Sequence, residues 1–535
     1  MRRLALCLAL ASTVALAKPP RLTLFISVDS FGTDALQTNR GRFKYGLAKL
    51  LGEGAVYPAA RYETLECVTA VGHATMATGT WAHRHGIVGN KTFNRATGKL
   101  EAPFFDASHP VLEAPPSGDD VSPVNLLAET VADRVRAGTH FKGKSVAVSG
   151  KARAAVAMGG HLGDAWWFHE AVGKFVTGTF YKKEFPAWVK AFNDKKLADA
   201  AFSKTWALTA PEKDYSGDDD RPFESDLHGL KRVFPHALTG GLPSPGPDSY
   251  AALAISPYAT ELLVDFAKAA IDGEQLGRDD APDLLSVSFS SVDRTYHLYG
   301  PNSWEYQDHL LRLDKALGEL ISAAEKAAGG KANLLVVLTG DHGGANIPEE
   351  WASQGIVAAR VSPATMKKNL NAAMEKQFGA PGLVAEFEEA DVYLDWKAVD
   401  AKKLDVKTVR RAVAAWLEKQ PEIFSAVSRD DLGALRTLST EAEHAFFPDR
   451  SGDVLFVMQP FQVLEVFPAG TSHGAPWSYD ADVPIFLYGK GVKSGHYGQA
   501  AQPIDLAPTV SALMELTPPA SSEGRVLFES ITLSK

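Results

Sequence analysis

Cysteine and long apolar runs are both scarce in this chain of 535 residues. Its cysteines are Cys7 and Cys67, so removal of the N-terminal segment would leave Cys67 without an intrachain partner. A disulfide framework is then excluded, and a chain of this length can bury a core that needs none. Beyond the N-terminus no stretch approaches the ~20 apolar residues that span a bilayer. We therefore expect a soluble protein after processing.

Positive charge is also in short supply. The formal net charge is −9 at pH 7, and loss of Arg2 and Arg3 with the N-terminal segment would make it more negative. Surfaces that bind nucleic acids show clustered lysine and arginine, so this balance argues against that class of partner. An anionic small molecule would have to be held by a local positive site.

The first 17 residues have the layout of a secretory signal peptide. Arg2 and Arg3 precede an apolar run over 4–16, and Ala15-Leu16-Ala17 supplies small residues for cleavage. A short membrane anchor is the alternative, but the run is too short to span a bilayer. We predict cleavage after Ala17 and export, to a periplasm in preference to the medium.

Short apolar runs alternate with longer segments of helical spacing. The runs that predict buried strands are 22–28, 145–148, 284–289, 334–338 and 484–488, and the helical segments include 260–271, 307–328 and 409–418. This alternation predicts an α/β fold, in which a mostly parallel sheet has helices on both faces. We expect residues 18–535 to form one catalytic domain. The regions near 155–255 and 345–470 would be insertions that cap its site.

Three of the apolar runs lead into an acidic residue. Asp29 directly follows the first run, Asp293 follows the third, and the pair Asp341-His342 follows the fourth. Ligands of open α/β sheets bind beyond the carboxyl ends of the strands. The sequence therefore predicts a site at that edge of the sheet.

These acids and three histidines suit a pair of zinc ions. Zinc binds histidine nitrogen and carboxylate oxygen, and a catalytic ion keeps one position open. The candidate ligands are Asp293, His297 and His473 for one ion, and Asp29, Asp341 and His342 for the other. The D-x-x-x-H spacing of the first pair places both side chains on one helix face. Each residue alone has a simpler role as a cap, turn or solvated residue, and manganese or cobalt suits similar ligands.

The segment 67–79 predicts a turn that leads into a helix, with Thr69 at its start. A hydroxyl there can cap the helix, and the segment alone favours that role. It can also be a nucleophile, because helix N-termini favour anions and a bound metal lowers the pKa of a coordinated hydroxyl. Thr75 and Thr78 fall inside the helix, where hydroxyls usually bond to the backbone. Cys67 is a weaker candidate nucleophile.

Taken in order, these motifs resemble the alkaline phosphatase superfamily. The matching elements are Asp29, Thr69-Ala-Val-Gly-His73, Gly86-Ile-Val-Gly-Asn90, Asp293-x-x-x-His297, Asp341-His342 and Thr-Ser-His473-Gly. Ser149-Gly-Lys151-Ala-Arg153 is similar to the K-x-R element of its threonine-nucleophile branch, the phosphate-irrepressible or PafA type. The similarity extends over nearly all of residues 18–535. Val71 departs from the pattern, where proline is common, and affects only the local backbone.

The resemblance implies zinc-dependent hydrolysis of phosphate monoesters. Zinc-bound Thr69 would form a covalent phospho-threonine, whose hydrolysis releases inorganic phosphate. Asn90 would donate its amide to a phosphoryl oxygen, and Lys151 and Arg153 would contact the transferred group. A cationic pair suits a dianion that keeps its charge on three non-bridging oxygens.

Other functions share part of this pattern. A nucleotide pyrophosphatase/phosphodiesterase has the same metals and threonine, but needs room for a second organic group where Lys151 and Arg153 would lie. An inactive phosphate-binding or adhesion protein would not need the complete ligand set, which is present. A sulfatase is disfavoured, because Cys67 is followed by Val-Thr-Ala and not by the C-x-P-x-R pattern. The expected partners are therefore small phosphate monoesters, with no nucleic-acid surface.

Overall fold

The computed structural model describes residues 18–115, 118–435 and 437–532. The predicted signal peptide, residues 1–17, lies outside the described residues. Within the described part of the chain, no helix is both long and apolar enough to cross a membrane.

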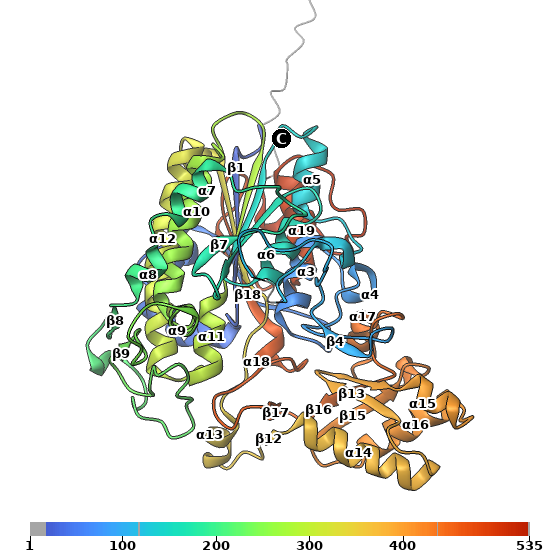
Figure 1. The fold of residues 1–535 in the computed structure, drawn as a ribbon. Coiled ribbons are helices and arrows are strands. Elements are labelled where there is room, and N and C mark those ends of the chain that lie inside the picture. The colour runs from blue at the N-terminus through green and yellow to red at the C-terminus, as the bar shows by residue number, and fades with distance from the viewer. Residues whose placement is uncertain (1–17, 116–117, 436, 533–535) are drawn as a thin grey trace, which may run out of the picture.

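A nine-stranded sheet forms the centre of the molecule (Figure 1). Its strands are β1 Leu22–Val28, β2 Ala55–Arg61, β5 Ser145–Ser149, β6 Asp164–His169, β7 Lys174–Val176, β10 Asp283–Phe289, β11 Leu334–Gly340, β18 Asp482–Gly489 and β19 Gly495–His496. They lie in the order β19-β2-β18-β11-β1-β10-β5-β6-β7. All five runs predicted as strands are confirmed, and the sheet is mostly parallel as expected.

Strand β18 is the exception among the predicted strands, because it runs antiparallel to both of its neighbours. The chain leaves β11 at the carboxyl end of the sheet, builds a long excursion there and returns as β18. A strand that re-enters from the same end of a sheet without crossing over must run in the opposite direction.

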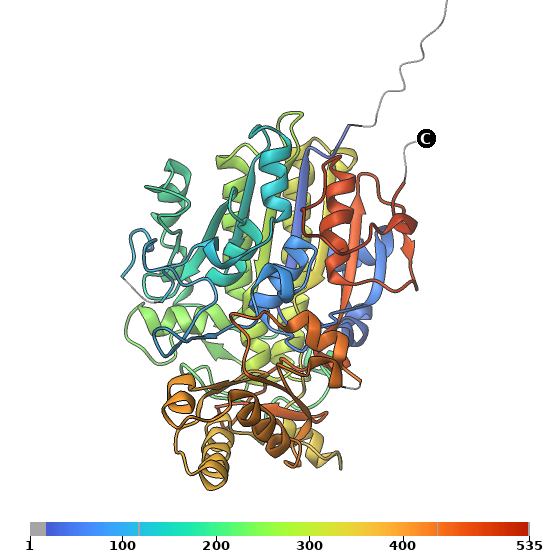
Figure 2. The ribbon, with the colours of Figure 1, turned by 90° about the vertical axis from the view of Figure 1, so that its right-hand side faces the viewer.

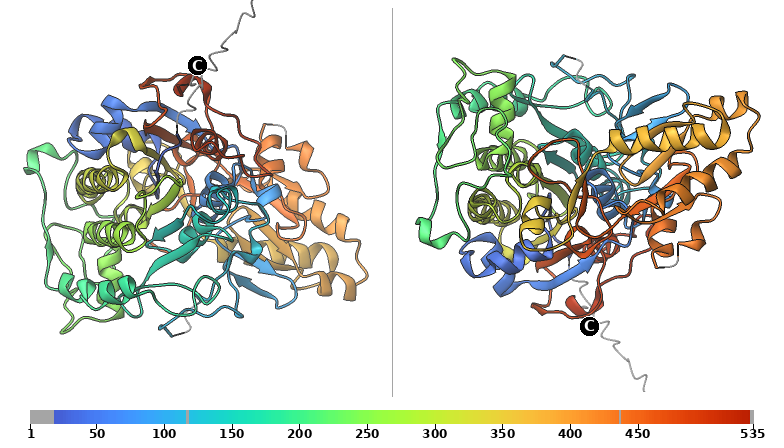
Figure 3. Two further views of the ribbon diagram at one scale, coloured as in Figure 1. Left: turned by 90° about the horizontal axis from the view of Figure 1, so that it is seen from above. Right: turned by 90° about the horizontal axis from the view of Figure 1, so that it is seen from below.

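Helices cover both faces of the sheet (Figures 1 and 3). One face carries α2 Gly46–Glu53, α10 Pro257–Gly273, α11 Ser290–Tyr299 and α12 Trp304–Ala328, and the other carries α3 Thr69–Thr78, α5 Val131–Gly138 and α19 Leu506–Leu513. Successive strand residues point to opposite faces. Accordingly Leu24 and Ile26 of β1 belong to one buried cluster, and Phe25 belongs to the other.

The region near 155–255 lies only partly outside this sheet. Strands β6 and β7 of that region form one edge of the sheet. The rest comprises α7 Ala187–Asn193, α8 Leu197–Ala201, α9 Pro247–Ile255 and the short ribbon of β8 Thr205–Trp206 with β9 His236–Ala237. It packs beside α10 and adds aromatic side chains to the buried cluster that contains Leu24 and Ile26.

The chain between β11 and β18 builds a second sheet with its own core, here called the small lobe (residues 363–458). Its antiparallel strands, in order, are β13 Val384–Glu388, β14 Asp391–Leu394, β16 Val454–Met458 and β15 Ile423–Ser428. Its helices are α14 Pro363–Phe378, α15 Trp396–Ala401, α16 Val406–Leu417 and α17 Ser439–Ala445. The small lobe lies beyond the carboxyl ends of the central strands (Figures 1 and 2).

One buried carboxylate, that of Asp453, connects residues of the small lobe with Arg95, which lies outside the lobe. Asp453 is fully buried and accepts hydrogen bonds from Arg95 Nη2 and Arg410 Nε, each at 2.9 Å. It also accepts from Trp396 Nε1 at 2.9 Å and from the backbone N–H of Leu394 at 2.8 Å. Two cations and two neutral donors thus offset the cost of burying this charge.

Replacing Asp453 by alanine should therefore destabilise the protein by about 3 kcal/mol, because two arginines lose their buried partner. Chemical denaturation would measure the change. Asp431→Ala is the matched control, since Asp431 pairs with an arginine on the exposed surface and such pairs contribute little. Equal midpoints for the two variants would contradict the role given to Asp453.

Candidate metal centre

Four adjacent parallel strands, β11, β1, β10 and β5, end at one place. Asp29 follows β1, and Asp341 and His342 follow β11. Asp293 lies in the first turn of α11, which begins directly after β10, and Lys151 precedes α6 Ala152–Gly159 after β5. The topology therefore brings together side chains that are far apart in the sequence.

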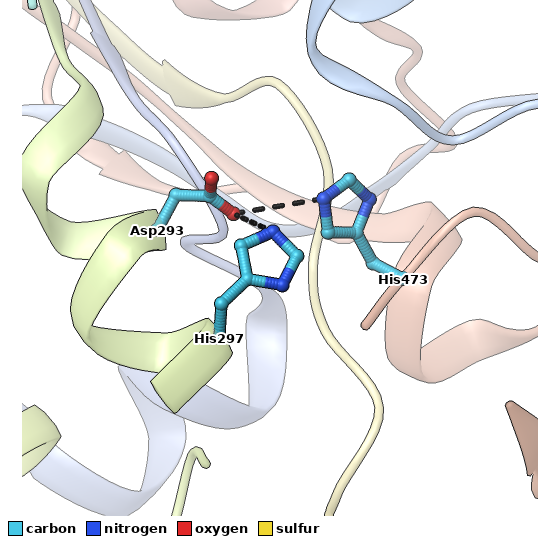
Figure 4. A group of neighbouring side chains, drawn as sticks. All are labelled: Asp293, His297 and His473. Carbon is cyan, nitrogen blue, oxygen red and sulfur yellow. Dashed lines mark ion pairs between the residues drawn. The ribbon is translucent and has the colours of Figure 1, made fainter. Parts of the chain in front are cut away.

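The first predicted ligand group is assembled in the structure. Asp293 and His297 lie one turn apart on α11, and His473 approaches from the loop before α18 Ser478–Ala481 (Figure 4). Asp293 Oδ1 lies 3.4 Å from His297 Nε2 and 3.6 Å from His473 Nε2. The ligand atoms all lie within 4.8 Å of one another, which is close enough for one ion to bind them.

All three predicted histidine ligands are oriented by backbone carbonyls. The pairs are His297 Nδ1 with the Thr471 carbonyl, His473 Nδ1 with that of Cys67, and His342 Nδ1 with that of Gly343, at 2.9, 2.9 and 2.8 Å. A carbonyl can only accept, so Nδ1 carries the hydrogen. In the neutral ring this leaves the Nε2 lone pair for a metal, which is the usual arrangement of metal-binding histidines.

The second group raises a choice between two histidines. Ligand atoms of Asp29, Asp341 and His73 lie within 4.8 Å of one another. Both ring nitrogens of His73 are engaged, however: Nδ1 lies 2.9 Å from the carbonyl one helical turn earlier, and Nε2 lies 3.0 Å from Ser288 Oγ. His73 therefore holds the start of α3 in place.

His342 fits the second group better. Its Nε2 lies 3.3 Å from Asp341 Oδ2, and neither buried atom has a hydrogen-bond partner among the described residues. Leaving two buried polar atoms unsatisfied is costly, and a bound cation would satisfy both. The chemistry of this set of donors therefore fits the predicted ligands Asp29, Asp341 and His342.

Lys151 lies between the two groups. Its Nζ is 2.6 Å from Asp293 Oδ2 and 3.1 Å from Asp29 Oδ2. Burial would raise the pKa of Asp293, but His297 and Lys151 outweigh burial and hold the pKa well below its usual range. Burial likewise opposes ionisation of Asp29, and Lys151 and His73 together keep its pKa lowered. Both carboxylates are therefore in the ionised form that a metal requires.

Thr69 is the first residue of α3, and Val68 occupies the capping position. The Thr69 side chain makes no capping hydrogen bond, so the capping role considered from the sequence is wrong. Its buried hydroxyl lies 3.4 Å from Lys151 Nζ and 3.5 Å from Arg153 Nη2. Two cations beside a hydroxyl favour its ionised form and attract an anionic substrate.

The competing nucleophiles are engaged elsewhere. Thr78 Oγ1 donates to the backbone carbonyl of Ala74 at 2.7 Å, as expected inside a helix. Thr75 Oγ1 instead pairs with His85 Nε2 at 3.2 Å. Burial raises the pKa of the Cys67 thiol well above its ordinary value, so it is an inert, structural cysteine.

Asn90 lies beside the N-terminus of α3. Its Oδ1 accepts the backbone N–H of Ala70 at 3.0 Å, which fixes the orientation of the side-chain amide. Asn90 and Arg153 line a cavity of about 280 Å³ together with His297 and His473. The small lobe and the segment after it add apolar side chains to the lining, including Met458 and Leu464. An anionic group at the ligand cluster thus has an adjacent space for an organic substituent.

Sequence reasoning missed the residues that hold the ligands. Ser30 Oγ donates to Asp293 Oδ1 at 2.5 Å, and Ser288 Oγ donates to Asp29 Oδ1 at 3.0 Å. Asp480 accepts the N–H groups of the two residues after His473, at 3.0 and 2.9 Å. The two serines stand beside strand ends that carry an acid, which is their only signal in the sequence. Asp480 has none.

Comparison with known proteins shows the family to which the chain belongs. The family model that describes type I phosphodiesterases and nucleotide pyrophosphatases matches residues 23–465, which places the chain in that class of phosphoester hydrolases. The chain is 32% identical to the alkaline phosphatase PafA of Elizabethkingia meningoseptica, over 96% of this chain and 94% of that protein. It is 30% identical to the alkaline phosphatase PhoV of Synechococcus elongatus, over 95% and 92%.

A crystal structure of wild-type alkaline phosphatase PafA has the same fold, with a TM-score of 0.91 and 30% identity over 96% of this chain and 99% of that one. The chain therefore belongs to the alkaline phosphatase superfamily, among the PafA-type alkaline phosphatases. The resemblance read from the motifs is confirmed, and so is the prediction of an enzyme of this class.

The choice between His342 and His73 can be tested by metal content. After loading with Zn²⁺ and dialysis, His342→Ala should retain about one ion fewer per chain than the parent, because a buried ligand is lost. His73→Gln should retain the parent's content, since both nitrogens of His73 already have protein partners. Elemental analysis measures both variants, and loss of an ion from His73→Gln alone would reverse the assignment.

Proposed function

We propose that this protein hydrolyses phosphate monoesters with two zinc ions, using Thr69 as the nucleophile and releasing inorganic phosphate. One observation carries the proposal. The buried Thr69 hydroxyl makes no helix-capping hydrogen bond and lies within 3.5 Å of Lys151 and Arg153, beside the two ligand groups. The relatives named alkaline phosphatases support a monoester as the substrate. They favour it over the diester substrate of a nucleotide pyrophosphatase.

The residues that would hold the ions are Asp293, His297 and His473 for one, and Asp29, Asp341 and His342 for the other, with the Thr69 hydroxyl as a further ligand. When bound, such a pair of ions lowers the pKa of a coordinated hydroxyl and neutralises charge on the attacking and leaving oxygens. The mixture of carboxylate and imidazole donors suits zinc.

Thr69 Oγ1 would attack the phosphorus of the ester. A bond forms between Oγ1 and phosphorus, the bond to the ester oxygen breaks, and the alcohol leaves. Water then attacks the phospho-threonine, which returns the Thr69 hydroxyl and releases phosphate. Splitting the reaction into two displacements gives each a manageable barrier. The N-terminus of α3, where Thr69 lies, favours negative charge in both displacements.

Lys151, Arg153 and Asn90 would bind the non-bridging oxygens of the transferred group. The guanidinium offers a planar fork, the ammonium a point charge, and the Asn90 amide a neutral donor. A monoester dianion uses all of these donors, because its charge stays on three oxygens in the transition state. A diester brings a second organic group into the same space and uses fewer of them.

We also propose that the protein acts after export. The apolar run that follows Arg2 and Arg3 supports export.

The cavity of about 280 Å³ beside the ligand groups suits the organic part of a small phosphate ester.

The role of Thr69 predicts that Thr69→Ala lowers kcat/KM for an aryl phosphate monoester by at least about 1,000-fold, because the covalent route is lost. Thr69→Ser keeps a hydroxyl and should retain most of the activity. Unchanged metal content in both variants is the control. Turnover by Thr69→Ala at the parent rate would end the proposal.

The cationic pair predicts a change in substrate preference. Lys151→Ala and Arg153→Ala should each lower kcat/KM for an aryl monoester by about 100-fold or more. Activity on the matching diester should fall far less, because the diester carries one negative charge fewer. Paired kinetics on the two esters measure the ratio. Parallel losses on both would show that the pair does not select monoesters.

A further inference from the structure

The turn between β13 and β14 reaches from the small lobe to the phosphate clamp proposed above. At its tip the Glu389 carboxylate accepts the backbone N–H of Asn90, with N···O distances of 3.0 and 3.1 Å. The next residue, Ala390, donates its backbone N–H to Glu66 Oε1 at 2.5 Å. Glu66 in turn lies three residues before Thr69 in the sequence. The tip is therefore fixed at two points around the nucleophile.

Asn90 transmits this contact to the start of α3. Its backbone is held by Glu389 on one side, and its side-chain Oδ1 is held by the N–H of Ala70 on the other. A residue with both ends fixed presents its amide in one orientation. Positioning of this kind matters in catalysis, because a donor displaced by about 1 Å can lose about 100-fold in rate.

The approach of Glu389 depends on a glycine. A Cβ atom added to Gly89 would lie 2.2 Å from Glu389 Oε2, so the carboxylate would have to move from its present place beside the Asn90 N–H. The backbone dihedral of Gly89 is one that other residues adopt, so glycine matters here through close approach: to Glu389 and, at 3.2 Å, to the backbone carbonyl of Lys91. The sequence thus leaves room for the carboxylate to reach the backbone of Asn90.

The charge state of Glu389 bears on how this residue acts beside the phosphate clamp. Burial and the neighbouring Glu388 raise its pKa to about 8, although the N–H of Asn90 opposes them. Glu389 also borders the same cavity as Arg153. Below about pH 8 Glu389 is mainly neutral, so its role beside an anion-binding site rests on its reach to the backbone of Asn90 and not on its charge.

We propose that Glu389 is a positioning residue, through which the small lobe holds Asn90 in the orientation that binds the transferred phosphoryl group. The inference rests on the proposed function, because it takes Asn90 as part of the phosphate clamp. Glu389 acts through Asn90 and does not itself touch the substrate.

Substitutions at Glu389 test this role by their kinetics on an aryl phosphate monoester. Glu389→Ala and Glu389→Asp should each lower kcat/KM by about 10-fold, less than the ~100-fold expected when a donor is lost outright. Aspartate keeps the carboxyl group but is one methylene too short to reach Asn90. Glu389→Gln keeps an acceptor oxygen at the same reach and should stay within about threefold of the parent.

Glu386→Ala is the matched control, on the strand β13 that leads into this turn. Glu386 pairs with Lys367 of α14 at 2.9 Å and makes no hydrogen bond to Asn90, so its loss should leave kcat/KM unchanged. Thermal unfolding of every variant shows whether the small lobe remains folded. If Glu389→Ala does not fold, the comparison of Glu389→Asp with Glu389→Gln replaces it.

A double-mutant cycle separates this inference from the proposed function. In an Asn90→Ala background, Glu389→Asp should cause no further loss, because the donor that Glu389 positions is absent. A full, additive 10-fold loss in that background would overturn the inference. Normal monoesterase activity of Asn90→Ala itself would instead remove Asn90 from the clamp, and the proposed function would then need revision.

Discussion

The concentration of buried negative charge at one edge of the sheet is the constraint on which this structure depends. Asp29, Asp293 and Asp341 are almost completely excluded from solvent and follow adjacent parallel strands. Carboxylates buried so close together repel one another, and each has lost its hydration. Lys151 offsets part of this cost by bridging two of them. The unsatisfied atoms that remain on Asp341 and His342 show where further positive charge belongs.

Geometry at this edge is set by the backbone as much as by side chains. The three histidines of the ligand groups are each held through Nδ1 by a carbonyl, and two of those carbonyls come from loops far away in the sequence. Such bonds fix both the tautomer and the ring orientation. The centre therefore exists only when the central sheet, the loop before α18 and the start of α3 are packed together.

The small lobe adds a wall to this centre and a contact with Asn90. It has a buried core of its own, and Asp453 joins it to Arg95, which follows Asn90 in the sequence. A segment that leaves and re-enters the sheet at the carboxyl ends of the strands can contribute to a binding site, because ligands bind there in α/β folds. Strands β12 Ala359–Val361 and β17 Gln462–Leu464 pair where the chain enters and leaves the lobe. The chain between β11 and β18 thus accounts both for the antiparallel direction of β18 and for one part of the cavity lining.

Local periodicity and spacing were enough to predict the strands, the acids at their ends and the helical turn that joins Asp293 to His297. The family was readable from the order of the motifs. Three contacts depend on tertiary packing instead. Val68 and not Thr69 occupies the N-cap position of α3, and Glu389 holds Asn90. His73 Nε2 meets Ser288, while His342 Nε2 has no hydrogen-bond partner among the described residues. Each of these is a contact between segments that the fold alone brings together, and no local pattern records which partner a side chain will meet.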